Sequence, residues 1–216
     1  MKDALTIHRA LLDRETPHQI VRLPVAITHA DELPRALGLP ARRCLVTRVY
    51  ACNDVHRERR FLTGVVVAAG TLPPTEVVRH AVGARLIRPA RPDLVNAVTE
   101  YAAGLVCPLL LPEAMPLLID QSVVDANPLD EVVYTATGEP STALAIRSLD
   151  LYTVSGAKPV ALPSAQTGAA STSVYASAYP SASPPAPAPA KRPAPTSHPA
   201  PTTAEPRSRR PEPHRT

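Results

Sequence analysis

Apolar residues at helical spacing open the chain. Ala4, Ile7 and Leu11 recur every three or four positions between Asp3 and Arg14, and this pattern predicts an amphipathic helix. Residues 19–23 then have the pattern of apolar and polar side chains of a short strand. The spacing Thr28-x-x-Asp31 indicates a capping box for a second helix, which we expect to end at Gly38 with Pro40 just beyond.

Two β-branched runs, residues 44–52 and 61–69, are separated by a charged segment and predict a hairpin with a polar loop. Proline pairs, glycines and short apolar runs predict the remaining elements. We expect helices at 73–82, 92–99 and 149–154, strands at 85–87, 117–120, 130–136, 142–146 and 159–162, and a structured loop at 101–116. Because hairpins dominate, the sequence favours an α+β domain with a curved, mainly antiparallel sheet over a doubly wound one.

Composition divides the chain at residue 162. Residues 163–216 hold 13 of the 27 prolines among Ala, Ser and Thr, and they have too few large apolar side chains to offset the entropy of an ordered chain. We therefore expect one folded domain at 1–162 and a disordered basic tail at 163–216. The tail has six basic and two acidic residues, which is the whole net charge of +4, whereas residues 1–162 have 17 of each.

Several classes of protein do not fit this pattern. The longest apolar runs fall far short of the roughly 20 residues of a membrane span, and the first residues lack the apolar core of a secretory signal. Cys44, Cys52 and Cys107 have no C-x-x-C spacing, so we expect free thiols, a cytoplasmic protein and no zinc site. The motifs of common nucleophile, metal and phosphate sites are missing, and we expect no cofactor.

The distinctive segment is the loop Gly104-Leu105-Val106-Cys107-Pro108. Gly104 lets the main chain approach a ligand, and Pro108 fixes the backbone at the other end. Backbone N–H groups held in this way can stabilise an oxyanion without a side-chain catalyst. The alternative is a rigid connector between a helix and a strand.

The order of these segments resembles the YbaK/EbsC family, which includes the editing domain of bacterial prolyl-tRNA synthetase and its free-standing relatives. The resemblance rests on Leu37-Gly-Leu-Pro40, the hairpin, Gly83-Ala-Arg-Leu86, Gly104-x-x-x-Pro108, Leu118-Ile-Asp120 and Gly138, and it covers the whole expected domain. It implies a mixed, barrel-like sheet with flanking helices and a pocket for the 3′ end of a mischarged aminoacyl-tRNA.

The same resemblance implies the site. Gly104, Pro108 and Asp120 would be the catalytic positions, with the loop holding the ester carbonyl while a water, a ribose hydroxyl or the substrate's own thiol attacks. Leu105, Val106, Cys107 and Gly138 would line the substrate pocket. A serine is common in relatives at Cys107, and we interpret this thiol as a buried space-filler rather than a nucleophile.

One position departs from the family. Counting six residues from Pro40 places Val46 where relatives have a lysine that contacts the terminal nucleotide. Arg48 lies two residues further on a strand, so its side chain would point to the same face and could replace that lysine. The alternative is a solvated strand arginine.

Three functions follow as hypotheses. The first is a free-standing deacylase that cleaves the ester of a mischarged tRNA, guided by arginines of the first hairpin at positions 42, 43, 48, 57, 59 and 60. The second is a degenerate relative that binds aminoacyl-tRNA, a nucleotide or a protein without hydrolysis. The third is a proline-rich tail that recruits a protein partner, with the domain as anchor.

Overall fold

The computed structural model describes residues 1–54 and 60–162. The hairpin tip and the tail expected at 163–216 lie outside the described residues, so the domain boundary at 162 stays a prediction.

The first helix and strand form as the sequence predicts. Helix α1 (Ala4–Leu12) is capped by Asp3, whose carboxylate accepts a hydrogen bond from the amide of Thr6 at 2.8 Å, and it buries Ile7 and Leu11. Strand β1 (His18–Arg22) follows and pairs antiparallel with β7 (Thr142–Arg147).

The second helical segment has a different cap from the one predicted. It consists of a 3-10 turn η1 (Ala30–Glu32) followed by α2 (Leu33–Leu37), and it ends at Gly38 as expected. The capping role that the sequence assigned to Asp31 belongs to Glu32, three residues after the N-cap residue His29. The carboxylate of Glu32 accepts hydrogen bonds from the amides of both Thr28 and His29, and this releases Asp31 for other contacts.

The predicted hairpin is the longest feature of the sheet. Strands β2 (Cys44–Asp54) and β3 (Arg60–Ala68) pair antiparallel, with Val46 opposite Val67 and Arg48 opposite Val65. A 3-10 turn η2 (Ala41–Arg43) leads into β2.

The remaining elements are, in chain order, α3 (Thr75–Ala81), β4 (Ala84–Pro89), α4 (Pro92–Thr99), β5 (Leu117–Asp120), α5 (Gln121–Ala126), β6 (Val132–Ala136), β7, α6 (Ser148–Ser155) and β8 (Lys158–Val160). Only α5 was not predicted. The segment between Glu100 and Leu117 is an irregular loop, as expected.

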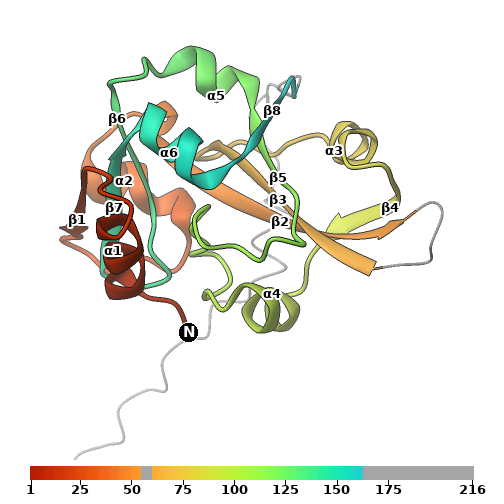
Figure 1. Cartoon of the computed structure of the whole chain (residues 1–216), viewed down its shortest axis with the longest axis horizontal. Coiled ribbons are helices and arrows are strands. Elements are labelled where there is room, and N and C mark those ends of the chain that lie inside the picture. Colours follow the sequence, from red (N-terminus) through yellow and green to blue (C-terminus); the bar gives the residue numbers. More distant parts are fainter. Residues whose placement is uncertain (55–59, 163–216) are drawn as a thin grey trace, which may run out of the picture. The chain divides into compact units, whose positions relative to one another are not determined.

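The eight strands of the described residues belong to one mixed sheet with the order β1-β7-β6-β2-β3-β5-β8, and β4 is an additional partner of β2. Four pairings are antiparallel and three are parallel, which agrees with the predicted mixed, mainly antiparallel sheet. The sheet curves but is open, because no pairing among the described strands joins β1 to β8. In Figure 1, β1 and α1 lie on one side of the domain, and β4 and α3 lie on the other.

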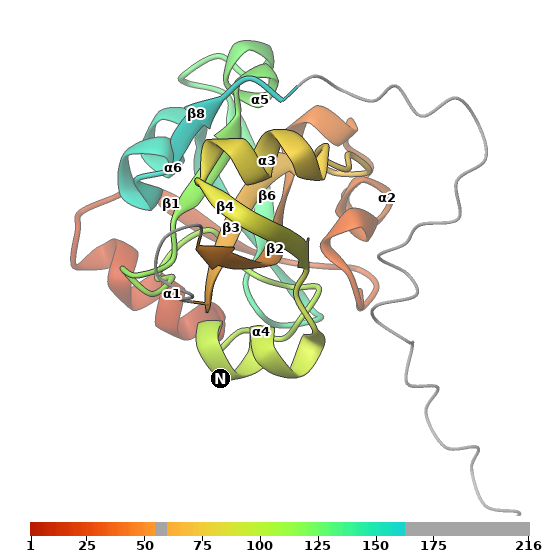
Figure 2. The same cartoon turned by 90° about the vertical axis from the view of Figure 1, so that its right-hand side faces the viewer.

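The sheet splits along one edge of β2. Strand β3 occupies one edge, so β6 and β4 must share the other: β6 pairs with Cys44 and Leu45, and β4 pairs with Tyr50–Asp54. Among the described strands none pairs with residues 46–49 on this edge. In Figure 2, β4 and α3 face the viewer and α4 lies below them. Polar groups and loops can therefore reach the middle of β2.

Candidate functional site

The Gly104 loop packs against residues 28–30, which lead into η1. Gly104 has a φ of +89°, a conformation that favours glycine. A Cβ atom at this position would lie 2.9 Å from the carbonyl oxygen of Thr28 and 3.1 Å from the His29 ring. The carbonyl of Gly104 also accepts a hydrogen bond from the amide of Ala30 at 2.8 Å. Close packing against the Thr28–Ala30 segment therefore requires glycine here.

His29, Asp31 and Arg48 form a polar cluster next to this glycine. The guanidinium of Arg48 donates two hydrogen bonds of 2.8 Å to the two carboxylate oxygens of Asp31 and further ones to the carbonyl of Thr71. The amide of Gly70 donates to Asp31 Oδ1 at 2.8 Å. Arg48 is 3% exposed, so this fork-to-fork ion pair lies in the interior.

The imidazole of His29 completes the cluster. Its Nδ1 lies 2.9 Å from Asp31 Oδ2 and 3.3 Å from the Asp31 amide nitrogen. Nδ1 cannot donate to the carboxylate and accept from the amide at once. Because the carboxylate contact is shorter and charge-assisted, we assign the proton to Nδ1. The His29 side chain is 21% exposed.

The electrostatics of the cluster centre on Asp31. Burial opposes ionisation of this carboxyl, but the hydrogen bond from His29, the charge and hydrogen bonds of Arg48 and the amide of Gly70 outweigh it. Together they hold the pKa of Asp31 well below its ordinary value. Asp31 is therefore a permanent anion that orients His29, an arrangement that other enzymes use to prepare histidine as a base.

Of the predicted pocket residues, Val46 and Leu105 come together. Both are buried in one apolar cluster with Cys44 and Ala136. The face of β2 that presents Val46 is thus the face against the loop. The side chains around Val46 are apolar.

Arg48 is placed differently from both alternatives that the sequence left open. It is neither a solvated arginine nor a side chain directed only at a ligand, because Asp31 and Thr71 hold its guanidinium. Its role as a direct substitute for the lysine remains a proposal. The geometry makes it the support of Asp31.

Val106 and Cys107 point into the main core on the other side of the loop. Cys107 is fully buried, and burial raises the pKa of its thiol to about 12 despite hydrogen bonds from Leu109 and Tyr101. A thiol of this kind is un-ionised at neutral pH and is a poor nucleophile. This agrees with its interpretation as a space-filler.

The other predicted site residues, Pro108, Asp120 and Gly138, lie outside the apolar cluster of Val46 and Leu105. Pro108 is buried and lines a cavity of about 470 Å³ that Arg14 and Lys158 also line. Asp120 is 2% exposed and caps α5, accepting hydrogen bonds from the amide and hydroxyl of Ser122. This cap explains the helix that the sequence did not predict.

Gly138 has a φ of +94°, and a Cβ there would meet the Lys2 carbonyl at 2.6 Å and the Tyr101 ring at 2.8 Å. Gly138 therefore packs against the start of the loop region. The ammonium of Lys2 fixes the same region, because it donates to the carbonyls of Thr99 and Leu110.

The hairpin arginines are mostly engaged. Arg42 and Arg43 form ion pairs with Glu131, at 3.5 and 3.1 Å, and Arg48 is paired with Asp31. Positions 57 and 59 lie outside the described residues. Arg60 is described, and it borders a cleft at the other end of the hairpin.

Sequence reasoning missed His29 and Asp31. Their i, i+2 spacing on a turn is not a known motif, and Asp31 appeared only as part of a capping box. Asp31 and Arg48 are 17 positions apart in the sequence, and only the fold brings them together.

Within residues 1–54 and 60–162 we find no group of three or more side chains suited to hold a metal ion. The same residues include no helix with the length and hydropathy of a membrane span. Cys44, Cys52 and Cys107 are free and buried.

Solved structures of other proteins have a similar fold. Three solved structures resemble it: a scaffold from computational epitope grafting (20% identity, TM-score 0.59), a hypothetical protein (18%, 0.60) and a protein described as a candidate trans-editing enzyme for prolyl tRNA synthetase (21%, 0.58). Each alignment covers 72% of this chain, and 93%, 97% and 93% of the respective structures. At these identities the likeness concerns the fold.

No curated protein matches the chain. The model of the aminoacyl-tRNA editing domain matches residues 25–154, which include the hairpin, the Gly104 loop and the His29 cluster. This range is more than half of the chain, and it confirms the family expected from the order of the sequence segments. The chain therefore belongs to the aminoacyl-tRNA editing domain family.

Proposed function

We propose that the protein is a free-standing deacylase that hydrolyses the ester of a mischarged tRNA. The observation that carries this proposal is the contact of His29 with the Gly104 loop. It places a histidine, oriented by the Asp31 carboxylate, beside a loop able to hold an ester carbonyl.

The proposed step needs no protein nucleophile. A water oxygen attacks the ester carbonyl while His29 Nε2 takes the water proton, and the bond to the ribose oxygen breaks as that oxygen receives the proton. Asp31 stabilises the imidazolium that forms between these events. Arg48 acts one step further away, because it keeps Asp31 ionised and in place.

The test is single-turnover hydrolysis with a panel of mischarged tRNAs. A general base contributes about 10²- to 10⁴-fold to rate, so His29→Gln should slow ester loss by at least ~100-fold. The matched control is His80→Gln, which changes an exposed histidine of α3 and should leave the rate unchanged. Ester loss no faster than in buffer across the panel would reject the deacylase.

A second candidate function has its own observation. Val46 is buried among apolar side chains and Arg48 is held by Asp31, so neither gives the pocket a cation for the terminal nucleotide. This favours a relative that binds aminoacyl-tRNA, a nucleotide or a protein without hydrolysing an ester. Tight binding of aminoacyl-tRNA by the wild type, with no turnover and no effect of His29→Gln, would select this function.

Two finer expectations stay proposals. We propose that the protein acts in the cytoplasm, where aminoacyl-tRNA is found. We also propose that the proline-rich tail is available to a protein partner. Pull-down with and without residues 163–216 tests the second expectation, which fails if the two sets of partners are the same.

A further inference from the structure

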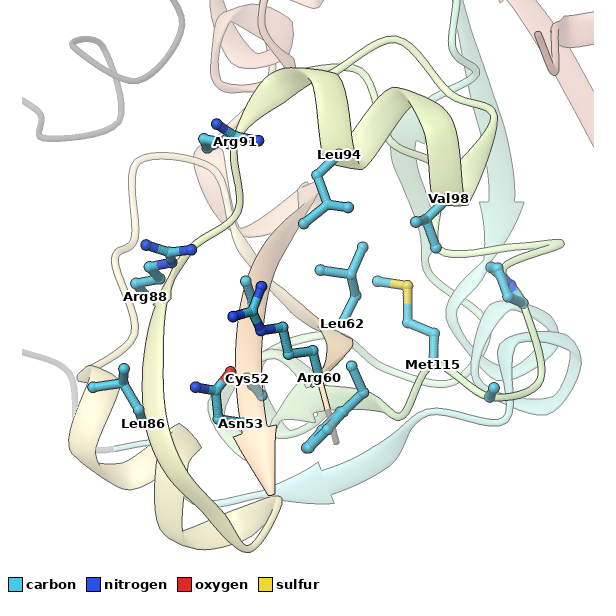
Figure 3. Close-up of a pocket in the computed structure, with 14 residues that line it drawn as sticks. Cys52, Asn53, Arg60, Leu62, Leu86, Arg88, Arg91, Leu94, Val98 and Met115 are labelled. Atoms are coloured by element: carbon cyan, nitrogen blue, oxygen red, sulfur yellow. The ribbon is translucent and has the colours of Figure 1, made fainter. Parts of the chain in front are cut away.

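A cleft of about 570 Å³ lies at the distal end of the hairpin, between β4 and α4. Its volume is in the range of small-molecule sites. Figure 3 shows Leu94 and Val98 pointing from α4 toward Leu62 and Met115, with Arg60 and Arg88 on the adjoining strands and Arg91 at the rim. The cleft thus combines an apolar interior with a basic edge.

Its charge is one-sided. Three of the lining residues are arginines and none is acidic. Arg91 forms an exposed ion pair with Asp93, whereas Arg60 and Arg88 have no carboxylate partner among the residues that the structure describes. Two guanidinium groups are therefore available at the edge of one cleft, and guanidinium groups match carboxylates and phosphates.

The apolar walls are unusually open to solvent. Leu86, Leu94 and Val98 are 56%, 37% and 38% exposed, and all three line the cleft. Leu86 and Arg88 alternate along β4 with Arg85 and Ile87, so strand geometry presents both residues on the cleft face. An exposed apolar surface rimmed by polar groups is typical of a binding site.

This cleft is separate from the His29 cluster. Successive side chains alternate across β2, which places Ala51 of the cleft on the face opposite Val46 and Arg48. No member of the His29, Asp31 and Arg48 cluster lines the cleft. A ligand here would not occupy the place of the scissile ester.

We propose that the cleft binds an amphipathic organic anion, with an aliphatic body and a carboxylate or phosphate head. The body lies along Leu62, Leu94 and Val98, and Arg60 and Arg88 hold the head. A free apolar amino acid fits poorly, because its ammonium group would face three arginines and no acid.

Calorimetry on the full chain tests the proposal with four probes. Octanoate has both the aliphatic body and the carboxylate, octan-1-ol has the body without the charge, and acetate has the carboxylate without the body. Leucine has an aliphatic side chain and a carboxylate but also an ammonium group. Octanoate should bind at least ~10-fold more tightly than any of the other three, as expected when a charge-assisted contact and apolar burial act together. Binding is measured without turnover, so the result is independent of the deacylase proposal.

Matched variants locate the site. Arg88→Gln should weaken octanoate at least ~5-fold, whereas Arg85→Gln, an exposed arginine on the other face of β4, should not. Leu94→Asn should weaken it at least ~3-fold, and Leu149→Asn, an exposed leucine of α6, should not. Circular dichroism and thermal melting establish that each variant is folded.

Three outcomes would overturn the proposal. The first is octanoate binding no tighter than acetate or octan-1-ol. The second is an equal effect of Arg88→Gln and Arg85→Gln. The third is a single-stranded RNA oligomer that displaces octanoate, binds more tightly and depends on Arg88, which would make the cleft a nucleic-acid site instead.

Discussion

Asp31 is the residue on which the polar cluster depends. Its carboxylate accepts hydrogen bonds from Arg48, from His29 and from the amide of Gly70. Arg48 is almost fully buried, so loss of the Asp31 carboxylate would remove an ion pair from the interior. Removing one member of a buried pair is far more costly than replacing the whole pair with apolar residues.

We therefore expect Asp31→Asn to lower the free energy of unfolding by about 3 kcal/mol at pH 7. Urea denaturation measures this value. The matched control is Asp93→Asn, which breaks the exposed pair with Arg91 and should cost under ~1 kcal/mol. Equal losses in the two variants would contradict an interior role for the Asp31 pair.

The pH dependence of this loss has a definite sign. The folded-state pKa of Asp31 is depressed, so its contribution to stability is complete above its unfolded value of about 3.9 and declines as pH falls below it. The asparagine variant has no such proton to bind. The stability gap between wild type and Asp31→Asn should therefore be constant from pH 5 to 7 and narrow below pH 4.

For single residues, the sequence predicted the place in a strand better than the contacts of the side chain. The sequence predicted that Val46 and Arg48 share one face of a strand. Both lie on β2, and Val46 shares an apolar cluster with Leu105. The partner of Arg48 could not be predicted, because a 17-residue separation closes only when η1 folds over the split in the sheet. The contact of His29 with the Gly104 loop could not be predicted either, because it also joins distant parts of the sequence.

Among the elements, the Gly104 loop is fixed from both ends. Lys2 ties its surroundings to the N-terminus, and Gly104 itself packs on the Thr28–Ala30 segment. Most of its side chains are buried, so its exposed surface is chiefly backbone near Gly104. Such a loop can present main-chain groups with little freedom to rearrange.

Gly104→Ala should disturb this loop in two ways, through its positive φ and through contact of the new methyl group with Thr28 and His29. Gly83→Ala is the control, because Gly83 also has a positive φ, of +65°, but has nothing within 4 Å of the new methyl group. Gly83→Ala should cost about 1 kcal/mol of unfolding free energy, and Gly104→Ala at least ~1 kcal/mol more.

Activity separates the two glycines further. Gly104→Ala should slow hydrolysis of mischarged tRNA at least ~10-fold, because a shift of the loop or of His29 misplaces the reacting groups. Gly83→Ala should retain wild-type rates under conditions in which both proteins are folded. Full activity in Gly104→Ala would remove the loop from the proposed site.

Element boundaries were predictable where the determinants are local. Asp3 before α1, Gly38 after α2 and Pro92 at the start of α4 all function as the sequence indicated. One local prediction failed because the side chain had another partner: Asp31 binds Arg48 instead of capping a helix. The six-residue helix α5, which Asp120 caps, was not predicted. The cleft between β4 and α4 has no sequence pattern, because it is lined by several separate segments.

At the scale of the whole molecule, charge is distributed unevenly. Residues 1–162 are neutral in sum, and the described arginines of the hairpin base are paired with Glu131 and Asp31. The net +4 belongs to residues 163–216. Long-range attraction of a polyanion such as tRNA should therefore come mainly from the tail, whereas chemistry should come from the domain.

A chain ending at residue 162 tests this division of roles. Protein–nucleic acid affinity falls with salt according to the number of phosphates neutralised, so truncation should make the plot of log affinity against log salt shallower by about one to four charges. The rate of ester loss at saturating protein should stay within ~2-fold of the full chain. Binding titrations at several salt concentrations, followed by single-turnover assays, measure both quantities. An unchanged slope would assign RNA attraction to the domain, and a lost rate at saturation would give the tail a part in the reaction itself.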